Sequence, residues 1–321
     1  HATLDPLAAR RPDGGLLAWA TLGDDDPVSP PPGRAGHNSS AAALLSYDIP
    51  HHAPWGWRVS LYTWTKGIGA GAFMVPVLLA LTGFLSWGDP VSRWAAPVLA
   101  LAFTGVTGVL LIWDLKHPLR FYLIFTRHHW RSWLVRGAFI LGGFGGVVTL
   151  YALAELAGLP GPVPRVLAWI GLPLALGTAV YTAYLFAQAK ARDLWQSPLL
   201  APHLAVQALV AGGAVTVLAA GLLSPDRGVR AAEVLLAASA AAHVLFVASE
   251  TTIGHVTEHA HWASAAMTRG RYARYFWPGL AMVAAAIAAP WAGPVAAVLA
   301  LAGLLAHEHA YVQAGQSVPL A

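Results

Sequence analysis

The chain has 321 residues, of which 57% are hydrophobic and only 11% are charged. A soluble domain typically carries about 25% charged residues, so the composition argues for a protein that crosses a membrane several times. The formal charge is +4, but the basic residues lie in loops between apolar runs, and we therefore expect no nucleic-acid partner. There is no cysteine, which excludes disulfides, thiol catalysis and an iron–sulfur cluster held by its usual ligands.

Residues 1–58 differ from the rest of the chain, because prolines, glycines and polar residues interrupt any regular pattern. Such a composition often stays unfolded. However, Trp19, Tyr47 and Trp55 are scattered through it, and these aromatic side chains favour an extended arm that orders against a partner subunit. We expect an arm at 1–58, a transmembrane domain at 59–313 and a short C-terminal tail at 314–321.

From residue 59 onward, long apolar runs follow one another. One membrane crossing needs about 20 apolar residues, which predicts an all-α membrane protein of about eight helices. We expect them to form two halves that each resemble a four-helix bundle, with Pro290 and Pro294 at a tight turn before the last helix. The expected spans are 60–86, 94–113, 133–155, 166–188, 199–222, 231–250, 276–291 and 294–312.

The distribution of basic residues predicts the orientation in the membrane. With this number of spans, both termini share one side with the loops after the second, fourth and sixth spans. Most Lys and Arg residues fall on that side. The positive-inside rule places it in the cytoplasm, with the chain in the inner membrane of a bacterium or archaeon. The periplasm is the alternative, because a large partner on the basic side would need those charges for its own binding.

Polar residues near the ends of two spans are candidates for a functional site, because ionisable groups at membrane depth are costly. Arg58, Tyr62 and Lys66 follow one another at intervals of four residues and so share one face of the first helix. Tyr181 and Tyr184 lie near the end of the fourth span, on the same side of the membrane. The alternative interpretation is that these side chains only anchor the helices at the interface.

The histidines offer weaker indications. His255 and His259 are four residues apart and could share a metal on one helix face, but the segment lies at the interface and lacks the H-E-x-x-H order. A haem needs two histidines on facing helices. Only His243 lies deep in a span, and no partner at its depth is evident. We therefore expect neither a metal nor a haem in this chain.

Several stretches together resemble the NrfD family of membrane subunits, to which the polysulfide reductase membrane anchor belongs. Each stretch is short, but they occur in the order of the family and span residues 57–312. Tyr181, and Glu250 with His255, belong to the same set. The stretches are Tyr62–Phe73, Trp113–Phe121, Arg131–Ala138, Ala191–Leu200 and Gly270–Gly279.

The resemblance implies a subunit that binds a quinone, either menaquinone or ubiquinone. In the family, this subunit sits beneath a ferredoxin-like protein with several [4Fe–4S] clusters, which usually connects to a molybdopterin-type catalytic subunit. By its place in the motif order, Tyr181 looks like the tyrosine that contacts the quinone. Tyr62 and Arg58 depart from the family pattern, since they fall where the polysulfide reductase has a histidine and an asparagine.

The residues and the resemblance together predict a quinone-reactive subunit of a respiratory oxidoreductase, inactive on its own. Tyr62 and Tyr181 can donate hydrogen bonds to the quinone carbonyls, and Tyr184 is expected beside them. Lys66 or Arg58 can stabilise a developing quinol anion, because opposite charges interact strongly in a low-dielectric site. The alternatives are a secondary transporter and a structural anchor without quinone chemistry.

Two further sets of residues are expected to carry protons and to bind the partner. Asp114 or His128 could carry protons to water. Asp114 could instead pair with Lys116 or Arg120. We expect the ferredoxin-like partner to dock on the basic loops and the arm. The docking residues are Lys116, Arg120, Arg127, Arg131, Arg192 and Trp195.

Overall fold

The structure is a computed structural model that describes residues 55–223, 227–253, 255 and 257–318, and every regular element within them is helical. Two short helices are α4 (Leu123–Thr126) and α9 (Glu258–Thr268). Single turns of π- or 3-10 helix are η1 (Val91–Ala95), η2 (Pro118–Arg120), η3 (Asp193–Gln196) and η4 (Ala286–Ala288). The helices of the membrane domain are α2 (Trp57–Leu81), α3 (Ala96–Asp114), α5 (Trp133–Leu156), α6 (Pro162–Ala187), α7 (Leu200–Leu223), α8 (Arg227–Thr252), α10 (Ala273–Ala285) and α11 (Ala289–Gly315).

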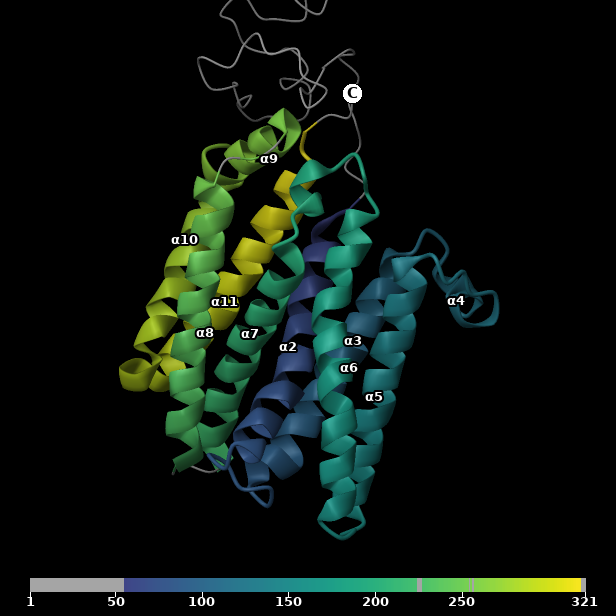
Figure 1. Cartoon of the computed structure of the whole chain (residues 1–321), viewed down its shortest axis with the longest axis vertical. Coiled ribbons are helices and arrows are strands. Elements are labelled where there is room, and N and C mark those ends of the chain that lie inside the picture. The colour runs from purple at the N-terminus through teal and green to yellow at the C-terminus, as the bar shows by residue number, and fades with distance from the viewer. Residues whose placement is uncertain (1–54, 224–226, 254, 256, 319–321) are drawn as a thin grey trace, which may run out of the picture.

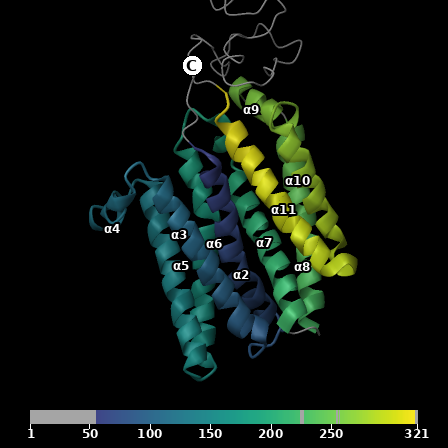
Figure 2. The same cartoon turned by 180° about the vertical axis from the view of Figure 1, so that it is seen from behind.

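Seven stretches of the described residues are long and apolar enough to cross a membrane. Six match the first six expected spans, and the seventh, Ala273–Gly315, joins the last two. The chain turns back within it at Gly293, which has a positive φ of 46°, and α10 and α11 pack side by side (Figures 1 and 2). The expectation of about eight helices is confirmed, although α10, with 13 residues, is only about 20 Å long and shorter than a full crossing.

Helix α2 lies at the centre of the domain and contacts α3, α6, α7 and α11. In Figure 1, α3, α5 and α6 lie on one side of it, and α7, α8, α10 and α11 lie on the other. Its approach to α7 is close because Gly71 faces Gly212, and a methyl group at either position would overlap the backbone of the other helix. This central position places the polar residues of α2 between the two halves.

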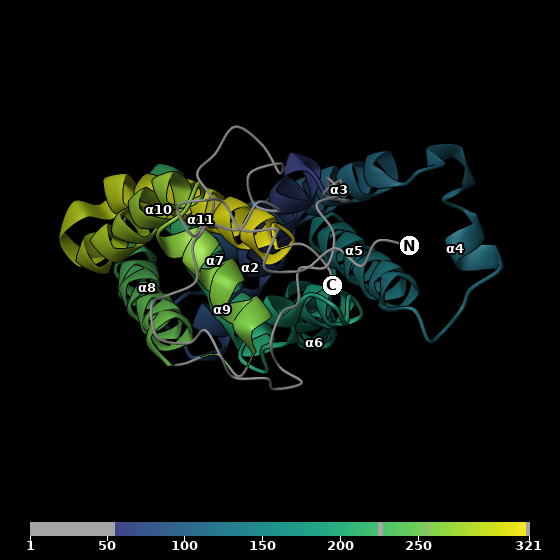
Figure 3. The same cartoon turned by 90° about the horizontal axis from the view of Figure 1, so that it is seen from above.

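Both short helices lie at one end of the bundle, which we call the basic end because it carries Lys116, Arg120 and Arg127 (Figure 1). Figure 3 shows α4 projecting sideways from the ends of α3 and α5, whereas α9 packs against α10 and α11. The Trp55 ring packs against both Phe186 and Trp195, with ring centroids 5.1 and 4.8 Å away. The rest of the expected arm, residues 1–54, lies outside the described residues.

Candidate functional site

A buried lysine and two buried tyrosines lie together where α2 meets α6. The Lys66 Nζ atom donates hydrogen bonds to the Ala179 carbonyl oxygen at 2.8 Å and to Thr182 Oγ1 at 2.6 Å. The ammonium also lies 4.9 Å from the centroid of the Tyr181 ring, a cation–π distance. Tyr62 is one turn before Lys66, and both tyrosines interact with the Thr182 side chain. The fold thus brings together candidates that the sequence placed on two separate spans.

Helix α5 contributes to this cluster through a glycine. A methyl group at Gly137 would overlap the ring of Tyr181, which is only 2% exposed. The glycine therefore lets the tyrosine lie flat against α5 and beside Lys66. It belongs to the Arg131–Ala138 stretch of the family resemblance, to which sequence reasoning gave no specific role.

Sequence reasoning missed a carboxylate that completes the cluster. Glu308, on α11, is 7% exposed, interacts electrostatically with Lys66 and is hydrogen-bonded to the Thr63 side chain. Lys66 and Glu308 also line a small cavity of about 10 Å³. That volume is about enough for one water. Removing either residue of such a buried pair leaves the other charge uncompensated, which destabilises the fold. Each residue therefore stabilises the charged form of the other.

An apolar cavity of about 420 Å³ lies between α3, α4 and α5 and reaches Tyr181. Binding pockets for small molecules commonly have volumes of about 300–1,000 Å³ and mainly apolar walls. Glycines of α3 and α5 leave space in the walls of this cavity. The lining residues are Leu101, Thr104, Gly105, Gly108, Leu111, Ile112, Leu115, Phe121, Ile124, Phe125, Leu134, Ala138, Leu141, Gly142, Gly145, Thr149 and Tyr181.

Arg58 and Asp114 lie between this cluster and the basic end. Asp114, at the end of α3, interacts electrostatically with Arg58 and with Tyr62. Its charged neighbour is therefore Arg58, whereas the sequence had left open a pairing with Lys116 or Arg120. Asp114 is half-buried and lies beside Tyr62, one of the two tyrosines expected to contact the quinone.

Tyr184 and His128 do not join the cluster. Tyr184 is 43% exposed, and its ring stacks on Trp133 with a centroid distance of 4.4 Å. His128 is exposed in the segment around α4, where its ring lies 4.9 Å from Trp130 and 6.0 Å from Phe139. Both side chains lie on the outside of the bundle, and we leave both out of the site proposed below.

The expected docking residues fall into two groups. Arg192 donates a hydrogen bond from Nη1 to the Val318 carbonyl oxygen at 2.5 Å, and burial lowers the pKa of its guanidinium. Trp195 is also buried, and its ring stacks on Phe186 with a centroid distance of 4.9 Å. These two side chains therefore hold segments of this chain together and offer little surface to a partner. The residues near α4 are exposed: Lys116, Arg120, Arg127 and Arg131.

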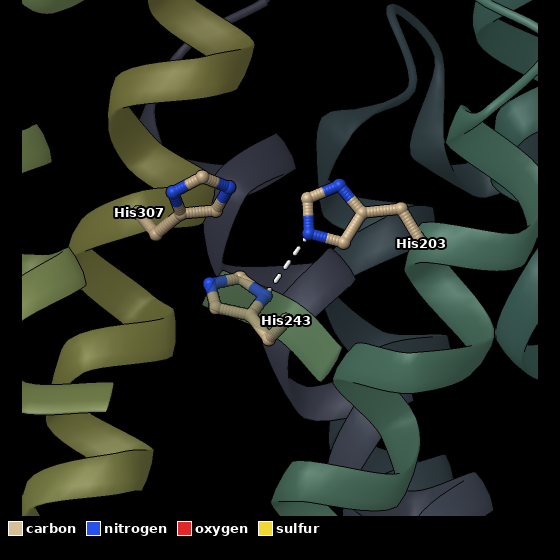
Figure 4. Close-up of side chains that lie close together, drawn as sticks. All are labelled: His203, His243 and His307. Atoms are coloured by element: carbon tan, nitrogen blue, oxygen red, sulfur yellow. Dashed lines mark hydrogen bonds between the residues drawn. The ribbon is translucent and has the colours of Figure 1, made fainter. Parts of the chain in front are cut away.

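Three histidines from α7, α8 and α11 meet inside the other half of the bundle (Figure 4). His203 Nε2 lies 3.0 Å from His243 Nδ1, and the ring centroids of His243 and His307 are 4.8 Å apart. The expectation that His243 lacks a partner at its depth is therefore wrong. The number of residues between a histidine and the expected end of its span was a poor guide to how deeply that histidine lies in the bundle. Helix α11, for instance, continues to Gly315 and carries His307 two turns inside the bundle.

A third cavity, of about 340 Å³, lies at the basic end between η3, α8 and α9. Glu250 and His255 are among the residues that line it. Burial lowers the pKa of His255, and the nearby His261 acts in the same direction, whereas Glu250 opposes the shift. Glu250 Oε1 also lies 3.1 Å from His203 Nδ1. This carboxylate thus connects the cavity with the three buried histidines.

The fold and these sites define a multi-pass membrane protein with a buried polar cluster beside an apolar cavity. The family model described as "Polysulphide reductase, NrfD" matches residues 47–319, and the chain belongs to this family. A curated relative, the C subunit of the polysulfide reductase of Wolinella succinogenes, is 25% identical over 300 residues, which cover 83% of this chain and 90% of the relative. The family expected from the motifs is confirmed, and the protein is a membrane subunit of a respiratory oxidoreductase complex.

Proposed function

We propose that this chain binds a quinone of the membrane pool and exchanges electrons between it and a ferredoxin-like partner with [4Fe–4S] clusters, which serves a molybdopterin-type catalytic subunit. The observation that carries the proposal is a large apolar cavity that reaches Tyr181, whose ring lies against the buried Lys66 ammonium. Membership of the NrfD family supports it. Because the chain has no cysteine, the iron–sulfur clusters that exchange electrons with the quinone belong to the partner.

The chemistry of quinone reduction assigns a task to each residue of the cluster. A quinone takes up two electrons and two protons to become a quinol, and negative charge develops on its carbonyl oxygens before the protons arrive. Tyr181 and Tyr62 donate hydrogen bonds to these oxygens. The Lys66 ammonium stabilises the developing charge, which it does most strongly in a buried, low-dielectric site. Glu308 and Asp114 lie beside these donors and replace the protons that they deliver.

The apolar cavity accounts for the other part of the ligand. A quinone carries a long hydrocarbon tail, which needs an apolar channel that opens to lipid. The cavity is lined mostly by aliphatic and aromatic side chains and by glycines, with Tyr181 at its polar boundary. We therefore place the headgroup beside Tyr181 and Lys66, and the first part of the tail between α3 and α5.

Tyr181→Phe tests this placement. The substitution removes the hydroxyl and keeps the ring that packs on Lys66, so we expect quinol-linked turnover of the intact complex to fall about 10- to 30-fold, the effect of losing one hydrogen bond to a charged oxygen. Turnover is measured in native membranes with a short-tailed quinol analogue. Tyr184→Phe is the matched control, because that hydroxyl lies on the outer surface of the same helix. Equal rates for both variants would instead indicate a structural anchor without quinone chemistry.

The exposed basic residues near α4 are the proposed docking surface, and we propose that they face the cytoplasm. Reversing the charges of Lys116, Arg120, Arg127 and Arg131 to Glu should weaken capture of the iron–sulfur partner, because electrostatic complementarity steers such encounters. The measurement is co-purification in mild detergent at low and at high salt. Arg165→Glu, at an exposed position on the opposite end, is the control. Undiminished capture by the reversed variant would refute this docking surface.

A further inference from the structure

Three imidazoles converge inside the bundle, at a place that the proposed quinone chemistry does not use. His203, His243 and His307 are 1%, 0% and 1% exposed. Figure 4 shows one ring nitrogen of each histidine turned toward the space between the three rings. One nitrogen from each ring lies within 4.8 Å of those of the other two. Nitrogens on a common tetrahedral Zn²⁺ lie roughly 3.4 Å apart, so small side-chain rotations bring the three into range.

Several ring nitrogens of these histidines make no hydrogen bond to the described residues. His243 Nε2 and both ring nitrogens of His307 are buried and have no hydrogen-bond partner among the described residues. A buried polar atom without a partner destabilises the fold, and such atoms are rare in native proteins. A cation bound between the rings would accept a lone pair from each of them. The arrangement is therefore more easily explained by a bound cation than by packing alone.

The surroundings supply what a metal-binding histidine usually has around it. Ligating histidines almost always donate their other ring N–H to a carboxylate, a carbonyl or water. Glu250 Oε1 lies 3.1 Å from His203 Nδ1, which places the proton on Nδ1 and the lone pair on Nε2. This Nε2 atom lies 3.0 Å from His243 Nδ1, and a cation between the rings would replace that contact. The carboxylate also offsets part of the positive charge of a dication in the bundle interior. Glu250 also lines the cavity at the basic end, so the carboxylate contacts both this cavity and the histidine cluster.

A fourth ligand is close at hand. The Gln207 side chain is one turn after His203 on α7, and its Nε2 lies 3.4 Å from His203 Nε2. Its Oε1 is buried without a hydrogen-bond partner in the part of the chain that the structure describes. A half-turn of the amide exchanges its nitrogen and oxygen positions and places this oxygen beside His203 Nε2. Three imidazoles and one oxygen form a tetrahedral set that suits Zn²⁺.

We propose that His203, His243 and His307 bind a divalent first-row cation, with Zn²⁺ as the best match, and that Gln207 or a water occupies the fourth position. The ion joins α7, α8 and α11, which come from separate parts of the chain. This site differs from the pair His255 and His259, which sequence reasoning considered and set aside. The inference is independent of the proposed quinone function, because it concerns metal content alone.

The test is the metal content of the intact complex, purified in metal-free buffers and measured by mass spectrometry of the elements. We expect about one zinc per chain. His243→Gln and His307→Gln, which keep a polar side chain of similar size, should each lower the zinc content at least tenfold. His309→Gln is the matched control, because His309 is on the same helix as His307 but its ring packs against Tyr275. The control should keep its zinc.

A second measurement tests for a site that has lost its ion during purification. The metal-free complex is incubated with Co²⁺, and the visible absorption bands of tetrahedral Co²⁺ should appear in the wild type and in His309→Gln, but not in His243→Gln. Two results would overturn the proposal. One is a wild-type complex that contains no zinc and takes up neither Zn²⁺ nor Co²⁺. The other is zinc that His243→Gln and His307→Gln retain as well as the wild type does.

Discussion

Replacing Lys66 by Met should lower quinol-linked turnover of the complex by about 100- to 1,000-fold, because loss of one preorganised donor at a site of developing charge has an effect of this size. The ammonium is 1% exposed and donates to Thr182 and to a backbone carbonyl, so solvent cannot replace it. Met keeps a similar length and volume and removes the charge. Turnover is measured with a short-tailed quinol analogue, and the amount of assembled complex is measured in parallel.

The charge of Glu308 complicates the single variant, and a double variant separates the two effects. Lys66→Met leaves a buried carboxylate without its counter-charge, which destabilises a fold strongly. Lys66→Met combined with Glu308→Gln removes both charges and should restore assembly to the wild-type amount. Its turnover per assembled complex should stay well below that of Glu308→Gln alone if Lys66 stabilises the quinol anion. Turnover that recovers together with assembly would show that Lys66 serves only to neutralise Glu308, and our assignment would then be wrong.

Hydropathy predicted the helices of this fold well, because a crossing helix must be apolar over most of its length. The structure differs from the prediction at helix ends, where the backbone conformation of single glycines determines where the helix stops. The first span was expected to continue to residue 86, but α2 ends at Leu81 and the chain turns at Gly83, which has a positive φ of 79°. The last two spans were expected as separate helices with a tight turn at Pro290 and Pro294, and the chain does turn back between these prolines, at Gly293, although helical structure continues up to the turn from both sides.

The site was predicted in part, and the reason lies in what periodicity can reveal. Tyr62 and Lys66 share a helix face, so their spacing was informative. Tyr181 was found through the family resemblance. Glu308 was missed although it lies inside an expected span, where an ionisable residue is a functional candidate by default. Its pairing with Lys66 joins residues far apart in the sequence, and no local pattern carries that information.

Gly137→Ala should lower quinol-linked turnover by about 100-fold, because a reacting geometry displaced by about 1 Å loses activity on this scale. The added methyl group overlaps the Tyr181 ring and displaces it from its present position. Gly146→Ala is the matched control. It lies on the same helix but outside the lining of the proposed tail cavity, and its methyl group would meet no neighbouring side chain within 4 Å. Both substitutions raise helix propensity equally, so only the contact with Tyr181 distinguishes them.

A double-mutant cycle shows whether Gly137 acts through Tyr181. If the methyl group works by displacing the tyrosine, Tyr181→Phe should add little to the loss already caused by Gly137→Ala, because the hydroxyl is no longer in place to be removed. Independent effects would instead multiply, as they do for distant residues. A multiplied loss, or full activity of Gly137→Ala alone, would contradict the placement of the headgroup beside Tyr181. Non-additivity would tie this glycine of the family motif to one task, the positioning of the tyrosine ring.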